Sequence, residues 1–354
     1  MSRNEKIDIS KSELRLIFPY AFKDCQTVKN LDISFNNLTK IYSKSFNGMT
    51  QLGFLYINSN KITQLESDVF QDVPLLTHLY LHGNFIENLD ENLFINCKNL
   101  VLIHLGWNQI EWLDTRIFKN LRKLRTIILD RNKLKSLDFS LINLESLDYL
   151  SVAMNQISEI NSETFKGANN LDILKISSNK IQKIYENFTI DFKNLTDLDF
   201  SRNNLSFLEP NFFAGLVRLE SLLLIECNIK TIDLGSLVNL QNLVLTSNKI
   251  SIFNQNLSSL THLSLNLNLL LDLNYSSIST PNSSLKYLDI TSCNLNYIDF
   301  NILRNLTNLE TIRLSGNQIT FDNQSFMGFK KLKSVYVNKD VENLKSLFPN
   351  ISFY

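Results

Sequence analysis

The feature that most constrains this chain is an eleven-residue pattern, L-x-x-L-x-L-x-x-N-x-L, which recurs along almost its whole length. Residues 76–86, LTHLYLHGNFI, follow it, and the windows 24 residues earlier and later repeat the same frame around Asn60 and Asn108. Most steps between copies are 24 residues long, and about 15 copies can be followed in register. One match to so short a pattern is common by chance, whereas a series in register predicts a solenoid of stacked copies.

Each copy is predicted to contain a short strand, because its leucines alternate with other residues at a period of two. In the copy around Asn84, Leu79 points inward while His78, Tyr80 and His82 point out on the opposite face. Successive strands are then expected to pair in parallel, about 4.8 Å apart.

The asparagine side chain can donate and accept hydrogen bonds, so we expect it to satisfy backbone groups where the chain leaves each strand. Cysteine is an accepted alternative at this position. Ser12 and Asp340 hold the position in the two end copies, which are expected to be atypical. The predicted structural ladder is Asn36, Asn60, Asn84, Asn108, Asn132, Asn155, Asn179, Asn203, Cys227, Asn248, Asn268, Cys293 and Asn317.

A phenylalanine recurs about ten residues after the ladder position and is predicted to fill the interior behind the strands. It is replaced by Leu141 in one copy. The predicted column is Phe22, Phe46, Phe70, Phe94, Phe118, Phe165, Phe213 and Phe326.

Repeats of 24 residues with this phenylalanine resemble the "typical" leucine-rich repeats of animal extracellular proteins, such as Toll-type receptor ectodomains and secreted invertebrate leucine-rich immune proteins. The resemblance covers residues 7–340 and implies an α/β leucine-rich repeat solenoid shaped as a horseshoe. In that fold a parallel β-sheet lines the concave face, and loops with short 3-10 turns form the convex face. The resemblance also implies a secreted or cell-surface protein that binds proteins or microbial products.

The unbroken repeat predicts a single leucine-rich repeat domain over residues 1–354, although this length alone would suggest two domains. Steps of 21, 20 and 25 residues make the repeats irregular over 228–293, where a polar run predicts a loop near 274–284. Residues 340–354 are predicted to form a C-terminal cap. Its helical spacing begins at Val341 and ends before Pro349, and the last residues add an edge strand.

Composition excludes several classes of function. The net charge is zero, so no basic surface is indicated and nucleic acid is not expected as a partner. No apolar run approaches the roughly 18–20 residues that span a membrane, and no signal-peptide core is seen. Cys25 and Cys97 lie three repeats apart, as do Cys227 and Cys293. That separation is roughly 15 Å at strand spacing, beyond the reach of a disulfide, so four free and mostly buried thiols are predicted.

Ten N-x-S/T sequons mark candidate glycosylation sites, although chance alone would give several in a chain this rich in Asn, Ser and Thr. All but one lie after residue 186, so glycans would crowd the C-terminal half. The candidates are Asn37, Asn187, Asn194, Asn204, Asn256, Asn274, Asn282, Asn305, Asn323 and Asn350.

No catalytic motif, cofactor-binding loop or metal-ligand pair is found, so neither an enzyme nor a cofactor is predicted. The histidines fall on outward strand positions. Strand spacing places His104 some 8 Å from both His78 and His82, too far apart for a shared zinc ion.

The candidate ligand-binding site is an aromatic patch at outward positions of neighbouring strands. Tyr, Trp and Arg are enriched at binding hot spots, and rings also stabilise sheets by cross-strand pairing, so both interpretations stay open. The aromatic patch consists of Phe54, Tyr56, His78, Tyr80, His82, His104, Trp107 and Arg131.

The favoured hypothesis is therefore a non-enzymatic recognition module, secreted or on a cell surface, that presents a protein or glycan ligand with a rigid concave sheet. Innate immune recognition or adhesion is the favoured role. The alternative is an intracellular leucine-rich repeat scaffold or regulatory subunit, which the free thiols and the absent signal peptide favour. Homo- or hetero-dimer formation stays open.

Overall fold

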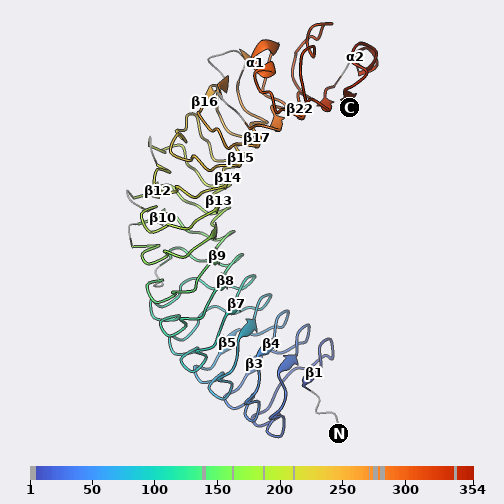
Figure 1. Ribbon diagram of the computed structural model, residues 1–354. Helices are drawn as coiled ribbons and strands as arrows, with labels where there is room; N and C mark the ends of the chain where they lie inside the picture. Colours follow the sequence, from blue (N-terminus) through green and yellow to red (C-terminus); the bar gives the residue numbers. More distant parts are fainter. Residues whose placement is uncertain are drawn as a thin grey trace. The chain divides into compact units, whose positions relative to one another are not determined.

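A computed structural model describes residues 5–137, 141–161, 163–185, 188–209, 212–270, 272–273, 278–279, 284–338 and 341–354. Internal contacts divide the chain into two compact units, Met1–Phe192 and Lys193–Tyr354. In each unit, short strands stack side by side in sequence order and pair in parallel, as the repeat predicts (Figure 1).

The strands of the first unit form one parallel row in which each strand pairs with the copy before and after it. Leu55, Leu79 and Ile103 are register partners on three successive strands, and all three are fully buried. In order, the strands are β1 (Lys6–Asp8), β2 (Asn30–Asp32), β4 (Phe54–Tyr56), β6 (His78–Tyr80), β7 (Leu102–His104), β8 (Thr126–Ile128), β9 (Tyr149–Ser151) and β11 (Ile173–Lys175).

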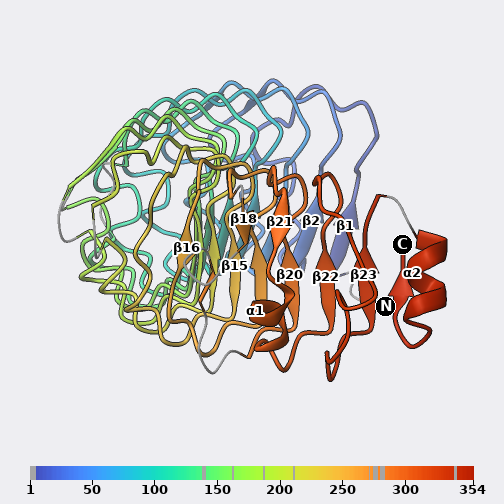
Figure 2. The same ribbon diagram turned by 90° about the horizontal axis from the view of Figure 1, so that it is seen from above.

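The second unit repeats this arrangement and adds two short helices, α1 (Phe300–Arg304) and α2 (Val341–Leu347). Figure 2 shows β20, β22 and β23 side by side, with α2 beyond β23. In order, its strands are β13 (Asp197–Asp199), β14 (Ser221–Leu223), β15 (Asn242–Val244), β17 (His262–Ser264), β20 (Tyr287–Asp289), β22 (Thr311–Arg313), β23 (Ser334–Tyr336) and β24 (Ser352–Phe353).

The segments that return from one strand to the next hold turns and small parallel ladders. The predicted 3-10 turns take the form of isolated i to i+3 hydrogen bonds, such as Cys97 N–H to the Phe94 carbonyl at 2.9 Å. No residue in the described ranges has continuous 3-10 helix geometry. The ladders are β3 (Lys40–Ile41) with β5 (Gln64–Leu65), β10 (Glu159–Ile160) with β12 (Lys183–Ile184), β16 (Phe253–Asn254) with β19 (Ile278–Ser279), and β18 (Asp272–Leu273) with β21 (Tyr297–Ile298).

The predicted phenylalanine column is confirmed as part of the core, because all of its members are buried. From Phe22 to Phe118 the rings stack one per turn with centroids 6.1–6.5 Å apart. Phe192, which the sequence pattern missed, fills the next place after Phe165, with ring centroids 5.1 Å apart. Leu141, the predicted replacement, is also buried.

The asparagines of the predicted ladder bind backbone groups where the chain leaves each strand. Nδ2 of Asn84 donates to the carbonyls of Ile57 (3.1 Å) and Leu81 (2.9 Å), and its Oδ1 accepts from the N–H of Ile62 (3.1 Å). Each side chain thus links its own turn to the preceding one. At the cysteine positions, the Sγ atoms of Cys227 and Cys293 approach the same kind of carbonyls, at 3.4–3.6 Å and 3.1–3.6 Å.

The residue before the ladder position has a left-handed backbone in turn after turn, and usually it is not glycine. Phe35, Trp107, Arg131 and Met154 have φ values of 54–56°. Their side chains are exposed at the end of the strand, where the chain turns away from the sheet. We call this row of positions the rim.

The number of turns differs from the sequence-based count. The solenoid makes about 13 turns, slightly fewer than about 15 predicted repeats. The pattern counts ladder positions and so includes both end copies, of which Asp340 lies outside the described residues. The predicted loop near 274–284 also lies almost entirely outside them. Within the predicted cap, α2 ends before Pro349 and β24 pairs with β23.

All four cysteines are free, as predicted. Cys97, Cys227 and Cys293 are buried, and Cys25 is half-buried. Burial raises the pKa of Cys97 and Cys227 to about 12 and that of Cys293 to about 11, so these thiols stay protonated at neutral pH.

Candidate functional site

The aromatic patch lies on the outward face of adjacent strands β4, β6 and β7 and at the rim beyond them. Alternation along the strand places the residues at both ends of each strand outward and half-exposed, while the central residue is buried. Because the strands pair in register, the outward residues of one strand lie beside those of the next. The structure brings the predicted residues together in three contact groups.

The first two groups are stacked rings. Phe54 and His78 stack with centroids 4.4 Å apart and an interplanar angle of 14°, and Tyr56 and Tyr80 stack at 4.7 Å and 6°. Tyr80 is also edge-on to His82 at 6.3 Å. These contacts supply the cross-strand pairing by which aromatic rings stabilise a sheet.

His82 and His104 stack with ring centroids 4.1 Å apart. The separation of some 8 Å estimated from strand spacing is therefore wrong for these two rings. Gly106, which sequence reasoning missed, makes the room, because a Cβ there would lie 2.9 Å from Cε1 of His104. The Gly106 N–H also donates to Nδ1 of His104 at 3.2 Å.

The third group is at the rim, where the guanidinium of Arg131 lies 4.0 Å from the centre of the Trp107 ring. This cation–π pair is worth about 0.5–1 kcal/mol at an exposed site. Trp107 remains 56% exposed. Neighbouring Asp130 is tied to the next turn, since its Oδ1 accepts from Ser151 Oγ at 2.5 Å and from the Ala153 N–H at 2.9 Å.

The strand part of the patch is uncharged at neutral pH. Burial lowers the pKa of His78 and of His82, and burial with the neighbouring His82 lowers the pKa of His104 to about 4. Burial raises the pKa of Asp130, although its hydrogen bonds oppose the shift. The arrangement therefore offers aromatic faces, with Arg131 as the cation at the edge.

Metal binding was not predicted for the histidines, and the His82–His104 contact is a ring stack. No group of three or more His, Cys, Asp or Glu side chains within the described ranges could hold a metal ion. Nδ1 of His82 is buried without a hydrogen-bond partner in this part of the chain.

A second cluster of aromatic residues, which sequence reasoning missed, lies at outward positions in the second unit. Each turn contributes only one member, so the cluster is visible in the sequence only when outward positions of successive copies are compared. We call it the tyrosine–arginine cluster. It consists of His262, Tyr287, Arg313, Tyr336 and Tyr354.

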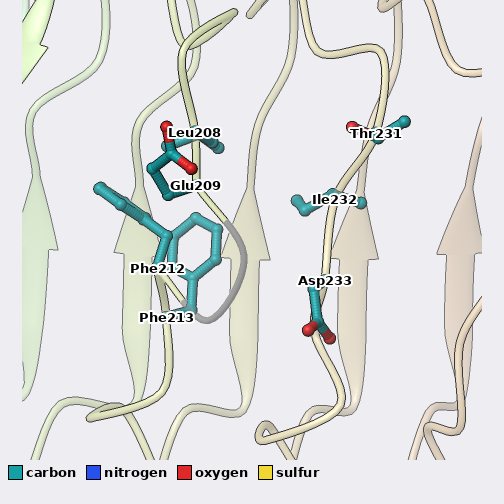
Figure 3. A pocket seen from close by; sticks show the side chains of 7 residues that line it. All are labelled: Leu208, Glu209, Phe212, Phe213, Thr231, Ile232 and Asp233. Atoms are coloured by element: carbon teal, nitrogen blue, oxygen red, sulfur yellow. The ribbon is translucent and has the colours of Figure 1, made fainter.

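A cavity of about 240 Å³ lies between the loops that follow β13 and β14. Figure 3 shows Phe212 and Phe213 on one loop and Ile232 and Asp233 on the next, with the ring of Phe213 between the loops. The step from Cys227 to Asn248 is 21 residues rather than 24, so the second of these loops is shorter. The volume is below the roughly 300 Å³ of common ligand pockets, so the cavity is the weaker candidate.

The sequons differ in exposure between the units. Asn204, Asn256, Asn305, Asn323 and Asn350 are exposed in the second unit, and Asn194 there is half-buried. Asn37, in the first unit, is half-buried.

The remaining sequons, at positions 187, 274 and 282, lie outside the described residues. Among the helices that the structure describes, none is long and apolar enough to cross a membrane.

Comparison with known proteins agrees with this geometry. A BspA-type leucine-rich repeat region model, in six copies, matches residues 15–144. A leucine-rich repeat model matches 145–189 and 283–340, and another matches 194–216. No curated protein sequence matches the chain.

Several solved structures are similar. The leucine-rich repeat protein LIC12759 of Leptospira interrogans is 20% identical, with a TM-score of 0.80 over 99% of this chain and 95% of that one. Toll, from the Drosophila Toll–Spätzle complex, is 23% identical, with a TM-score of 0.70 over 90% and 48%. TLR13, from a complex with ssRNA13, is 24% identical, with a TM-score of 0.70 over 99% and 50%.

This chain spans about half the length of the Toll and TLR13 chains. At these identities the similarity shows the fold, and the narrower assignment to the "typical" extracellular repeats stays a prediction. Leucine-rich repeat solenoids typically serve as binding scaffolds, with extended surfaces formed by stacked repeats. The matched repeat models and the parallel solenoid show that the chain belongs to the leucine-rich repeat family.

Proposed function

We propose that this protein is a non-enzymatic recognition module that binds a protein or glycan ligand with the strand face of its first unit. The observation that carries the proposal is the aromatic patch, a contiguous set of half-exposed rings on three adjacent strands. Large rings at outward positions give much contact area for little loss of side-chain entropy.

The contacts within the patch support binding because they hold the rings in place before a ligand arrives. Phe54 stacks on His78, and Tyr56 stacks on Tyr80, so little side-chain ordering remains to oppose association. Trp107, with Arg131 over one face of its ring, adds an exposed aromatic surface at the rim. Aromatic and arginine side chains of this kind are the residues enriched at hot spots.

We place the protein outside the cell or on its surface, with innate immune recognition or adhesion as its role. The Phe-marked 24-residue repeat supports this setting, and so does the similarity in fold to Toll, which was solved bound to Spätzle. The exposed sequons also support it. They lie in the second unit, so glycans on them would leave the patch residues unmodified.

The alternative is an intracellular scaffold or regulatory subunit, and one observation favours it. All four thiols are unpaired, as is usual in a reducing compartment. Expression in a secreting animal cell with a supplied signal sequence separates the two hypotheses. A soluble product that loses mass on glycosidase treatment favours the extracellular setting. A retained, unglycosylated product favours the intracellular one.

Nucleic acid is not expected as a ligand, since the net charge is zero. One protein of similar fold, TLR13, was nevertheless solved with ssRNA13, so single-stranded RNA belongs in the ligand panel. The same preparation tests dimer formation, by measurement of the protein's mass in solution with and without ligand.

Binding itself is tested by screening the full chain against panels of extracellular proteins, glycans and single-stranded RNA, followed by affinity measurements on any hit. Tyr80→Ala is expected to weaken binding about 30-fold, the effect of losing a hot-spot residue. Tyr149→Ala is the control, because Tyr149 is also a half-buried tyrosine at an outward position, at the start of β9 and outside the patch. Equal losses for the two variants, or none for either, would contradict the assignment of the site.

A further inference from the structure

The tyrosine–arginine cluster of the second unit is built around one cation. Arg313 is on β22, and its guanidinium carbon lies 4.5 Å from the centre of the Tyr336 ring on β23 and 5.9 Å from that of Tyr287 on β20. Tyr354 stacks on Tyr336 with centroids 4.8 Å apart, and His262 stacks on Tyr287 at 5.8 Å. The arginine thus lies between two aromatic pairs on neighbouring strands.

Arg313 has no ion-pair partner among the described residues, and its Nε is buried without a hydrogen bond there. Asp289 is its register partner on β20, yet the two do not form an ion pair. The Asp289 carboxylate is occupied otherwise, since Oδ1 accepts from the Thr291 N–H at 3.0 Å and Oδ2 accepts from the Tyr287 hydroxyl at 3.4 Å.

A guanidinium that lies beside aromatic rings is suited to recognise oxyanions. Its N–H donors lie in one plane and match the two oxygens of a carboxylate. A half-buried cation without a neutralising partner is also costly to leave desolvated, and an incoming anion would remove that cost. The geometry therefore indicates an anion-binding position on the strand face.

We propose that Arg313 binds the carboxylate of an acidic side chain in a partner protein segment that lies across β20, β22 and β23. Tyr287 and Tyr336 hold the guanidinium, and the 59% exposed ring of Tyr354 extends the apolar surface on which the segment rests. This site shares no residue with the aromatic patch, and it does not depend on the function proposed for that patch.

Charge favours a carboxylate over a doubly charged phosphate. The cluster carries one cation, Arg313, and one buried acidic residue, Asp289, on the adjacent strand. A singly charged planar anion can pair with the guanidinium while staying clear of the aspartate. A dianion would meet stronger repulsion from Asp289 for the same single arginine.

The test follows the Nε–H signal of Arg313 in the full chain with ¹⁵N-labelled arginine, assigned by its loss in Arg313→Lys. The probe is the capped tripeptide acetyl-Gly-Glu-Gly-amide. The matched controls are its Gln counterpart and inorganic phosphate. The Glu peptide is expected to move the Arg313 signal in a saturable manner, whereas the two controls leave it in place. No saturable shift, or an equal shift with either control, would overturn the proposal.

Variants distinguish a specific binding site from a general response of the arginine signals to added salt. Tyr336→Ala is expected to weaken binding of the Glu peptide about tenfold, whereas Tyr336→Phe, which keeps the ring, is expected to retain binding. The signal of Arg202, which already pairs with Glu226 at 3.3 Å, serves as the internal control and is expected not to saturate. Equal responses from Arg202 and Arg313 would count against the site.

Discussion

Replacing Asn108 by alanine should destabilise the solenoid more than its size suggests. Its Nδ2 donates to the carbonyls of Leu81 at 3.1 Å, Leu105 at 2.9 Å and Gly106 at 3.2 Å, and its Oδ1 accepts from the Ile86 N–H at 3.0 Å. The side chain is only 3% exposed, so water cannot take over these bonds without local opening.

The expected loss follows from the groups left behind. A buried backbone donor or acceptor without a partner costs about 1–3 kcal/mol. Asn108→Ala leaves the Ile86 N–H without a partner, whereas the carbonyls of Leu81 and Leu105 still accept from Nδ2 of Asn84 and Asn132. One orphaned donor, together with the lost bonds to those carbonyls, gives about 2–4 kcal/mol in unfolding free energy. Asn108→Cys should cost less, because the sulfur of Cys227 at the equivalent position approaches the same kind of carbonyls.

The assay is urea unfolding followed by circular dichroism and by tryptophan fluorescence, since Trp107 and Trp112 lie within four residues of Asn108 in the sequence. Asn99→Ala is the control. The Asn99 side chain makes two solvent-exposed bonds, one to the Pro74 carbonyl and one from Lys123 Nζ, so its loss should change stability by under about 1 kcal/mol. If Asn108→Ala falls within about 0.5 kcal/mol of this control, the reasoning that the ladder links successive turns is refuted.

Three further predictions concern individual residues. The pKa of His104 is depressed to about 4, so the folded state resists protonation, and stability should fall by at most about 3 kcal/mol as pH drops from about 6.5 to 4. His104→Gln removes the titrating group, so the urea concentration at the unfolding midpoint should fall less over this pH range. A pH profile equal to that of the unsubstituted protein would contradict the assignment. Gly48→Ala should cost about 1–3 kcal/mol, because Gly48 has φ +93° and a Cβ would lie 2.4 Å from a carbonyl oxygen of the preceding turn. Gly53→Ala, where the nearest atoms are 3.7 Å away, should shift the melting temperature far less. Finally, a thiol reagent should label no more than Cys25 in the native protein and reach the other thiols only on unfolding, while rapid labelling of several would show that the core is open.

The sequence predicted the repeating elements because each turn of a solenoid uses the same position for the same task. The spacing of Asn84 in the repeat was enough to predict its place at a turn between strands. The spacing of Phe70 was enough to predict its place in the core. The cap helix that ends before Pro349 was predictable for the same reason, since helical spacing and a stop signal are local.

Contacts between side chains were not predictable from spacing. Strand separation fixes where His82 and His104 are attached, but it does not fix the rotamers or the room that Gly106 leaves, and these bring the rings to 4.1 Å. The tyrosine–arginine cluster escaped notice because Tyr287 and Arg313 are separated by a whole repeat and become neighbours only when the turns stack.

The left-handed backbone at the rim has a consequence for how such a protein can change. Phe35, Trp107, Arg131 and Met154 differ in size and charge, yet they share one backbone conformation, and the N–H of each donates to a carbonyl of the next turn. Their side chains contribute little to the core, so selection for folding places few demands on their identity. The rim residues could therefore be replaced one at a time during evolution, which would change the binding preferences of the protein while its fold stays the same.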